Sequence, residues 1–360
     1  MSYNVIRTFD TEGFGTGSMR VGDLNGDCIP ELLLTQNYPM NREISCLTAM
    51  DLDGNVLWQY GKPGVGGADN YADLPVQIYD WDGDGKNEVL FVQQAKYKIA
   101  DMWCYSKSCR VVKEVHDQDE VRLDPDLASE RAQEYDGDAS LIVLDGATGE
   151  VKATYPVPAP ADDCMAIGYF DGTGKPNLIM KDRYWNMWAV NNEGKELWHV
   201  TSAQIGADLG HYPGVGDIDG DGLDEVFITN TMFDSDGSVM WKIEDGPGRG
   251  DHHDSAIFFT DVEEPRIITG SDKIRCLSAT GEVLWEREGG HWQQVIAGKF
   301  STDPKHGPYQ FLGRDRAPEY PNYKVAGENG HRRNIPGQVC TLFDWDGNII
   351  WRMMDPVETF

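Results

Sequence analysis

Two alternating patterns of hydrophobic and polar residues recur along the chain. The first is a period-two strand that runs into an acidic turn and a second strand, as in SMRVGDLNGDCIPELLLTQ and PGVGDIDGDGLDEVFIT. The second is a strand, a glycine turn and another strand that usually ends in tryptophan, as in CLTAMDLDGNVLW and IRCLSATGEVLW. Short alternating runs between turn signals are typical of β-strands, so we expect an all-β chain.

The two patterns alternate strictly and together form a four-stranded unit that occurs six times. One such sheet cannot bury both of its faces, whereas blades stacked around an axis can. The sequence therefore predicts a single β-propeller domain over residues 1–360 with six recognisable blades; a seventh blade that uses the terminal strands is the alternative. The N-terminal NVIRTFD is expected to be a lone outer strand. The recurring tryptophans are expected to pack between blades: Trp58, Trp198, Trp241, Trp285 and Trp351.

Two insertions interrupt this rhythm. One spans about residues 96–138, is highly charged and lies inside the second repeat. The other spans about residues 314–338 and is rich in Arg, Pro, Tyr and Asn. Long insertions leave a propeller from its loop ends, where functional sites form.

Three of the turns carry acidic residues at alternate positions. Side chains at alternate positions of a tight turn point inward, so carboxylates and a backbone carbonyl can surround a hard cation; Ca²⁺ takes about six to eight oxygen ligands. Strands flank these turns and the terminal Glu of an EF-hand is missing, so they are not EF-hands. We expect Ca²⁺ in them, and solvated Asp-Gly turns are the alternative. The candidate ligands are Asp80, Asp82, Asp84 and Glu88, then Asp217, Asp219, Asp221 and Glu225, and in the first repeat Asp23, Asn25, Asp27 and Glu31, where Cys28 replaces a glycine.

The formal net charge is −29, which argues against nucleic acid and an anionic membrane surface as partners. Bound cations would offset part of this charge. No apolar run reaches membrane-spanning length. The N-terminal sequence does not read as a signal peptide, so a cytoplasmic location is expected unless a leader was removed.

Histidines and cations mark a second candidate site. His211, His253 and His291 each precede the first strand of consecutive repeats, a position at one mouth of a propeller channel. Converging polar groups of this kind indicate a site, although isolated histidines at strand ends are common. Arginine pairs with carboxylates and aromatic rings stack on sugars, so nearby cations suggest an acidic oligo- or polysaccharide; surface salt bridges are the alternative. These residues are Lys181, Arg183, Tyr184 and Trp185, with Arg314, Arg316 and Tyr320 at the second insertion.

The stretch from about Asn177 to Asp261 resembles the family 11 polysaccharide lyases, the rhamnogalacturonan lyases, which are calcium-binding propellers of pectin degradation. KDRYW, GHYPGVGDIDGDGLDEV and GRGDHHD follow one another in the order of that family. SMRVGDLNGD and PVQIYDWDGDGKNEV are similar to its earlier blades. The chain departs from the family in being shorter, with fewer blades, and in having no counterpart of an early histidine around residues 70–73.

The resemblance implies an enzyme of carbohydrate metabolism that cleaves a rhamnose/uronic-acid glycan by β-elimination. A cation or an arginine neutralises the uronate, a base removes the C5 proton, and an acid protonates the departing O4. Two other functions stay open: a non-catalytic calcium-dependent propeller that binds glycans or proteins, and a rhamnose–glucuronate glycosidase, which would need paired carboxylates. The base candidates are His211, His253 and His291, the acid candidate is Tyr184, and Arg183 or Arg314 would hold the carboxylate, with Lys181, Trp185, Arg316 and Tyr320 beside the substrate.

Overall fold

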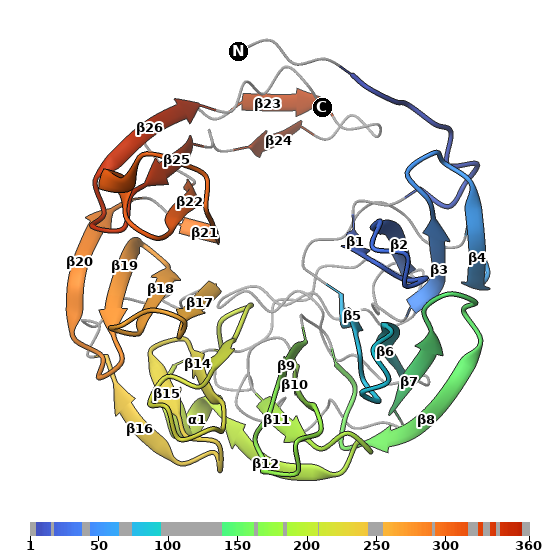
Figure 1. Ribbon diagram of the computed structural model, residues 1–360, viewed down its shortest axis with the longest axis horizontal. Helices are drawn as coiled ribbons and strands as arrows, with labels where there is room; N and C mark the ends of the chain where they lie inside the picture. Colours follow the sequence, from blue (N-terminus) through green and yellow to red (C-terminus); the bar gives the residue numbers. More distant parts are fainter. Residues whose placement is uncertain are drawn as a thin grey trace. The chain divides into compact units, whose positions relative to one another are not determined.

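The fold is built almost wholly from antiparallel β-sheets. The computed structural model describes residues 5–15, 18–37, 44–64, 74–94, 139–161, 165–182, 186–207, 209–243, 255–289, 292–315, 323–326, 332–335 and 339–354. These residues form six four-stranded sheets and one two-stranded sheet (Figure 1). Two short helical segments accompany them, α1 (Ser202–Ile205) and the 3-10 helix Pro304–His306. The all-β prediction is confirmed. Within this part of the chain, no helix has the length and apolar character needed to cross a membrane.

The chain divides into two compact units. The first comprises Met1–Ile167 and Thr173–Thr201, and it contains the first two sheets and nearly all of the third. In each sheet the strands follow one another in chain order. The first sheet consists of β1 (Met19–Gly22), β2 (Glu31–Asn37), β3 (Ile44–Met50) and β4 (Val56–Gly61); the second of β5 (Val76–Tyr79), β6 (Glu88–Gln94), β7 (Ala139–Asp145) and β8 (Val151–Val157); the third of β9 (Ala166–Gly168), β10 (Asn177–Lys181), β11 (Asn186–Val190) and β12 (Glu196–Thr201).

The second unit comprises Gly168–Gly172 and Ser202–Phe360 and holds the other sheets. The fourth sheet consists of β13 (Gly214–Gly216), β14 (Glu225–Ile228), β15 (Thr231–Phe233) and β16 (Val239–Lys242); the fifth of β17 (Ser255–Phe259), β18 (Arg266–Gly270), β19 (Lys273–Ser278) and β20 (Val283–Glu288); the sixth of β21 (Trp292–Gly298), β22 (Gln310–Asp315), β25 (Val339–Phe343) and β26 (Ile349–Met354).

The two predicted insertions have different outcomes. Between β22 and β25, the second insertion contains a separate hairpin of β23 (Tyr323–Ala326) and β24 (Arg332–Ile335). The first insertion, between β6 and β7, lies outside the described residues.

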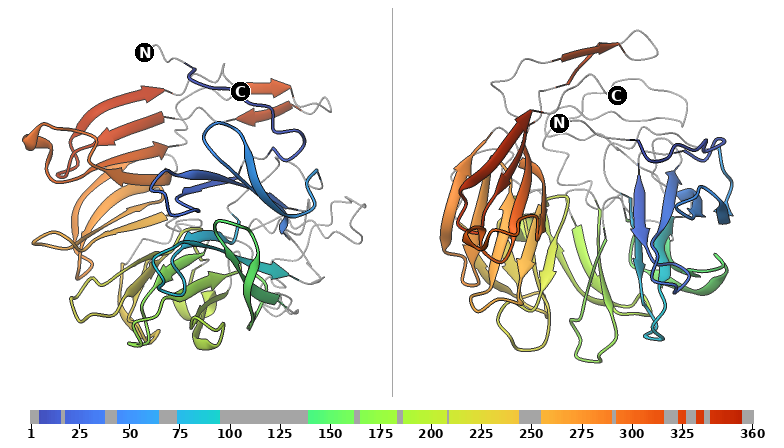
Figure 2. Two further views of the ribbon diagram at one scale, coloured as in Figure 1. Left: turned by 45° about the vertical axis from the view of Figure 1, so that its right-hand side comes forward. Right: turned by 45° about the horizontal axis from the view of Figure 1, so that its top comes forward.

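The sheets of each unit stack face to face, which explains their burial. In the second unit β13 packs against β17, and β17 packs against β21 (Figure 2, yellow to red). The middle strands β3, β10 and β11 are buried at every residue, because both faces of each sheet are covered. The last strand of a sheet is different: β20 alternates between exposed and half-buried residues. Burial of apolar area between sheets is the main stabilising contribution.

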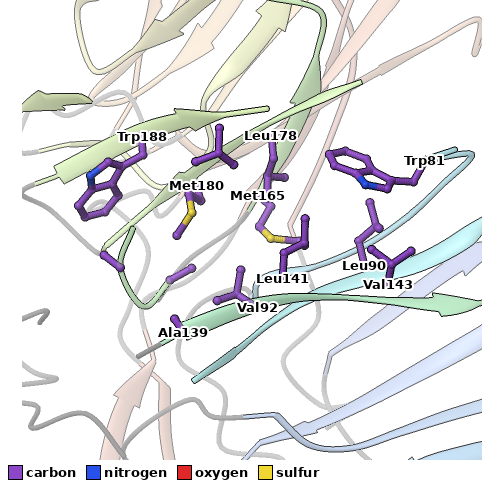
Figure 3. Packing of buried hydrophobic residues seen from close by; sticks show 13 residues of the cluster. Trp81, Leu90, Val92, Ala139, Leu141, Val143, Met165, Leu178, Met180 and Trp188 are labelled. Atoms are coloured by element: carbon purple, nitrogen blue, oxygen red, sulfur yellow. The ribbon is translucent and has the colours of Figure 1, made fainter. Parts of the chain in front are cut away.

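One core cluster of the first unit lies between its second and third sheets (Figure 3). β6 and β7 supply Leu90, Val92 and Leu141, while β10 supplies Leu178 and Met180, all at most 1% exposed. Trp81 closes the cluster from the acidic turn of the second sheet.

Three of the five recurring tryptophans, Trp58, Trp241 and Trp285, join successive sheets of each unit, as predicted. Nε1 of Trp58 donates to the Gly146 carbonyl oxygen at 2.7 Å, in the hairpin turn of the next sheet. The equivalent bonds run from Trp241 to Ala279 at 3.0 Å and from Trp285 to Trp345 at 3.1 Å. The glycine of each receiving turn leaves room for the ring, since a Cβ on Gly281 would lie 2.7 Å from Trp241.

The second sheet has alanine, Ala153, where the others carry this tryptophan, and Trp81 takes over its role. Ala153 pairs with Val143 in the register that Trp58 and Ala49 have in the first sheet. Nε1 of Trp81 donates to the Asn192 carbonyl oxygen at 3.2 Å, in the corresponding turn of the third sheet. The connection between these two sheets is therefore kept by a residue of the acidic turn, not by one of the last strand.

The expected N-terminal outer strand is not formed. Residues 5–10 have no strand pairing. Arg7 instead donates to the Leu52 carbonyl oxygen at 2.7 Å and forms an ion pair with Asp53. Side-chain bonds to the β3–β4 turn thus replace a backbone ladder.

Candidate functional site

The three acidic turns share one hydrogen-bond scaffold. In the fourth sheet, Oδ1 of Asp217 accepts from the Gly220 amide at 2.7 Å, and its Oδ2 accepts from the Gly222 amide at 3.1 Å. Asp80 caps Gly83 and Gly85 in the same way in the second sheet, and Asp23 caps Gly26 and Cys28 in the first.

The sixth position of each turn has a left-handed backbone. Gly85 and Gly222 have φ of 87° and 93°, which glycine adopts without strain. Cys28 has φ of 66° at the matching position, where a side chain is disfavoured. The backbone amide of Cys28 also lowers the pKa of Asp23, as the largest contribution to that shift.

A buried glutamate closes each turn from the following strand. Oε2 of Glu31 accepts from the Leu24 amide at 2.7 Å, Oε2 of Glu88 from Trp81 at 2.8 Å, and Oε2 of Glu225 from Ile218 at 2.7 Å. The three glutamates are at most 2% exposed. One oxygen of each glutamate therefore accepts a hydrogen bond from the turn backbone, and the second oxygen remains for another hydrogen bond or a cation.

The second oxygen has a different partner in each turn. Oε1 of Glu31 accepts from Nδ2 of Asn25 at 2.8 Å, and Oε1 of Glu88 accepts from Nζ of Lys152 at 2.6 Å. Oε1 of Glu225 is buried and has no hydrogen-bond partner among the described residues. Burial raises the pKa of Glu225 to about 7. A bound cation would stabilise the charged form of this carboxylate.

The fourth turn fits a hard divalent cation. Carboxylate oxygens of Asp217, Asp219 and Glu225 lie within 4.8 Å of one another, a spacing that one ion can bridge. Asp80, Asp82 and Glu88 meet the same criterion in the second turn. All of these donors are oxygens, which suits Ca²⁺ better than a softer metal.

The fifth repeat does not keep this arrangement. Asp261, at its first position, accepts a hydrogen bond from the Tyr309 hydroxyl group. A side chain from the sixth sheet thus occupies the carboxylate, and this turn is not among the three predicted calcium sites.

Three of the residues predicted to act on a substrate lie in the described part of the chain. Lys181 ends β10 and is fully buried. His211 is 8% exposed, and the neighbouring Gly210 amide donates to Oγ1 of Thr229 at 2.9 Å. Thr229 follows β14, so His211 lies near the end of the fourth sheet that is opposite its acidic turn. Arg314 of β22 donates to Oε1 of Gln294 at 2.9 Å. Outside the described residues lie His253, His291, Arg183, Tyr184, Trp185, Arg316 and Tyr320.

A polar network that the sequence motifs did not reveal joins Asp182 and Asn186, the residues on either side of Arg183, Tyr184 and Trp185. Asp182 accepts from the Asn186 amide at 2.8 Å and from Nδ2 of Asn186 at 2.5 Å. Nε2 of His199 lies 2.9 Å from Oδ1 of Asn186, and its ring stacks on Trp188 with centroids 4.9 Å apart. Asp182 is fully buried, so these hydrogen bonds between the end of β10 and the start of β11 are shielded from water.

Comparisons with known proteins agree with this picture. No protein-family model matches the chain. Rhamnogalacturonan endolyase YesW of Bacillus subtilis is 27% identical over 95% of this chain and 58% of its own length. Rhamnogalacturonan exolyase YesX of the same organism is 25% identical over 95% of this chain and 60% of its own. The chain thus spans about three fifths of the length of these curated relatives.

A solved structure gives the same result for the fold. The rhamnogalacturonan lyase of Bacillus licheniformis matches with a TM-score of 0.54 and 20% identity, over 93% of this chain and 57% of that chain. The resemblance to family 11 rhamnogalacturonan lyases is confirmed, and it extends well beyond the motifs between Asn177 and Asp261.

Proposed function

We propose that this chain is a polysaccharide lyase that cleaves a rhamnose/uronic-acid glycan by β-elimination. The observation that carries the proposal is the similarity to two rhamnogalacturonan lyases over 95% of the chain. These relatives are longer than this chain, so the proposal places the lyase activity in the segment that they share with it. The partner is then an acidic oligo- or polysaccharide.

The fold that would carry this activity is one β-propeller domain over residues 1–360. Its support is the repeated four-stranded sheet, the stacking of sheets within each unit, and the tryptophan bonds between successive sheets. Closure of such a ring leaves no long unpaired sheet edge.

Calcium would occupy the acidic turns of this propeller. The unpartnered Oε1 of Glu225 supports the fourth turn most strongly. When bound, the ion would neutralise the carboxylates and join the turn to the strand that carries its glutamate. The proposed ligands are Asp217, Asp219, Asp221 and Glu225, with Asp80, Asp82, Asp84 and Glu88, and Asp23, Asn25, Asp27 and Glu31 in the other two turns.

The reaction would use groups at the sheet ends opposite the acidic turns. An arginine, Arg183 or Arg314, pairs with the uronate and disperses the charge that develops when C5 loses its proton. A neutral histidine among His211, His253 and His291 removes that proton, and Tyr184 donates a proton to the departing O4. The buried Asp182–Asn186 pair fixes the ends of the segment that carries Arg183 and Tyr184.

The test compares turnover of rhamnogalacturonan by the wild type, Arg183→Ala and His253→Ala, with melting temperatures as the control for folding. We expect both variants to lose activity and to melt near the wild-type temperature. Full activity in both variants would refute the site assignment. If Arg183→Ala does not fold, turnover is measured in Arg183→Lys, which keeps the charge but cannot pair with a carboxylate in the bidentate geometry.

A further inference from the structure

The second acidic turn differs from the other two in holding a cation of the protein itself. Nζ of Lys152 lies 2.6 Å from Oε1 of Glu88, 2.6 Å from Oδ2 of Asp82 and 3.8 Å from Oδ2 of Asp84. The Lys152 side chain is 29% exposed and Glu88 is 1% exposed, whereas Asp82 and Asp84 are 45% and 48% exposed, so the contact is partly shielded from water. One ammonium group therefore meets three of the four carboxylates that were predicted to bind Ca²⁺.

Lys152 reaches the turn from a β-bulge that recurs in all six four-stranded sheets of the described chain. In the second sheet, Val143 pairs with Ala153 and Leu144 pairs with Val151, which leaves Lys152 as the extra residue of the outer strand. The fourth sheet has the same irregularity, with Met240 between the paired Val239 and Trp241. Bulges redirect a side chain and interrupt the ladder locally.

The residue at this bulge is apolar in every sheet except the second. These residues are Leu57, Leu197, Met240, Leu284 and Ile350. In the first four of them the side chain is 36–45% exposed, so no core demands an apolar residue there. A lysine occurs in a sheet whose turn has four acidic residues, whereas the fourth sheet, whose turn has a fifth acidic residue in Asp224, carries Met240 at the bulge and has an unpartnered Glu225 oxygen.

Lys152 and Ca²⁺ cannot both occupy the second turn without electrostatic repulsion. Ca²⁺ binds carboxylate oxygens at about 2.4 Å, so an ion on Asp82 and Glu88 would lie no more than about 5 Å from the ammonium that contacts the same groups. Both cations would repel each other in a partly shielded site. Binding of the ion then requires Lys152 to swing out into solvent.

We propose that Lys152 is a tethered internal cation that competes with Ca²⁺ for the second turn. The second sheet is thereby stabilised without metal, and its turn takes up Ca²⁺ only at concentrations well above those that fill the fourth turn. The inference rests on the proposed calcium binding for the comparison with the fourth turn, whereas the occupation of the second turn by lysine stands on the contacts of Lys152.

The test measures Ca²⁺ binding by calorimetry in the full chain and in Lys152→Met, which installs the residue found at this position in the fourth sheet. Leu284→Met is the matched control, because it lies at the same bulge of a sheet whose turn was excluded as a calcium site. We expect Lys152→Met to gain one tight site, with an affinity raised at least about tenfold. Asp80→Asn added to Lys152→Met should remove the gained site.

A melting experiment and a reciprocal variant test the same inference independently. In EDTA, Lys152→Met should melt below the wild type, because Asp82 and Glu88 lose their ion pairs with Nζ of Lys152, and Ca²⁺ should restore the loss. The reciprocal Met240→Lys should weaken Ca²⁺ binding at the fourth turn. A Lys152→Met isotherm and melting curve identical to those of the wild type and Leu284→Met would overturn the inference. A wild type without any Ca²⁺ binding, beside a gain in Lys152→Met, would support the inference and would refute calcium at the first and fourth turns.

Discussion

The Ile218 amide and Oε2 of Glu225 form a hydrogen bond of 2.7 Å that closes the acidic turn of the fourth sheet onto strand β14. This bond fixes the glutamate in a fully buried position and leaves its other oxygen, Oε1, without a hydrogen-bond partner in the described chain. A buried polar atom without a partner costs about 1–3 kcal/mol of folding free energy. A cation bound by this carboxylate would offset that cost.

Glu225→Gln should separate the structural cost of the carboxylate from its role in metal binding. In EDTA the variant is expected to be about 1 kcal/mol more stable than the wild type, because a neutral amide replaces the uncompensated buried charge. With Ca²⁺ at about 100 times its Kd, the wild type should gain about 2.7 kcal/mol. The variant should gain less. Thermal unfolding of both proteins with and without Ca²⁺ measures these differences, and an equal calcium response in the two would contradict the assignment of Glu225 as a ligand.

Cys28→Gly should stabilise the first turn. Cys28 has φ of 66°, in a region where a side chain costs about 1–2 kcal/mol, and glycine removes that strain. Gly85→Ala is the matched reverse substitution, because a Cβ there would meet no atom within 4 Å and only the backbone changes. Denaturant unfolding should therefore show a gain of about 1 kcal/mol for the first variant and a similar loss for the second. Shifts of the same sign would show that backbone strain is not the cause.

Trp81→Phe should weaken the contact between the second and third sheets. The variant keeps an aromatic ring but loses the bond from Nε1 to the Asn192 carbonyl oxygen, at a cost of about 0.5–1.5 kcal/mol plus a smaller packing loss. Trp241→Phe, which loses the equivalent bond to Ala279, should cost a similar amount. Trp81→Ala should cost about 3–5 kcal/mol, since Trp81 is 3% exposed. If Trp81→Phe leaves stability unchanged while Trp241→Phe lowers it, Trp81 does not replace the missing tryptophan.

The repeat pattern made the strands and turns predictable, because alternation and turn residues are local signals. Trp58, Trp241 and Trp285 could be assigned to contacts between sheets for the same reason, as each recurs at one place in its repeat. Trp81 could not, since its partner Asn192 is 111 residues away and no repeat marks it. The N-terminal segment was wrongly expected to be a strand, because its alternation is compatible with an extended segment held by Arg7.

The chemistry of the turns was only partly predictable. Spacing identified Asp82 and Glu88 as possible ligands, but it does not reveal that Lys152, 64 residues from Glu88, reaches both. Likewise, the sequence does not reveal that Oε1 of Glu225 has no hydrogen-bond partner in the described chain, because this depends on which groups surround the oxygen in the fold. The motif KDRYW drew attention to Arg183 and Tyr184, while the hydrogen bonds of Asp182 with Asn186 became visible only in the structure.

Asp182→Ala should impair catalysis by loosening the segment that carries Arg183 and Tyr184. Asp182 accepts two hydrogen bonds from Asn186, and a displacement of about 1 Å in positioning groups can cost about 100-fold in rate. We expect kcat to fall more than KM rises, because orientation in the transition state is lost. Asp182→Asn, which keeps one acceptor oxygen, should retain more activity. Wild-type kcat in Asp182→Ala would exclude a positioning role for this network.

The most direct test of the account is the chemistry of the product released from rhamnogalacturonan. The proposed β-elimination predicts that the chain, incubated with this glycan, produces new ends with the ultraviolet absorbance of an unsaturated uronic acid, in step with chain cleavage. New reducing ends without that absorbance would identify a hydrolase, and tight binding of the glycan without cleavage would identify a binding protein. Either of these two results would contradict the lyase assignment.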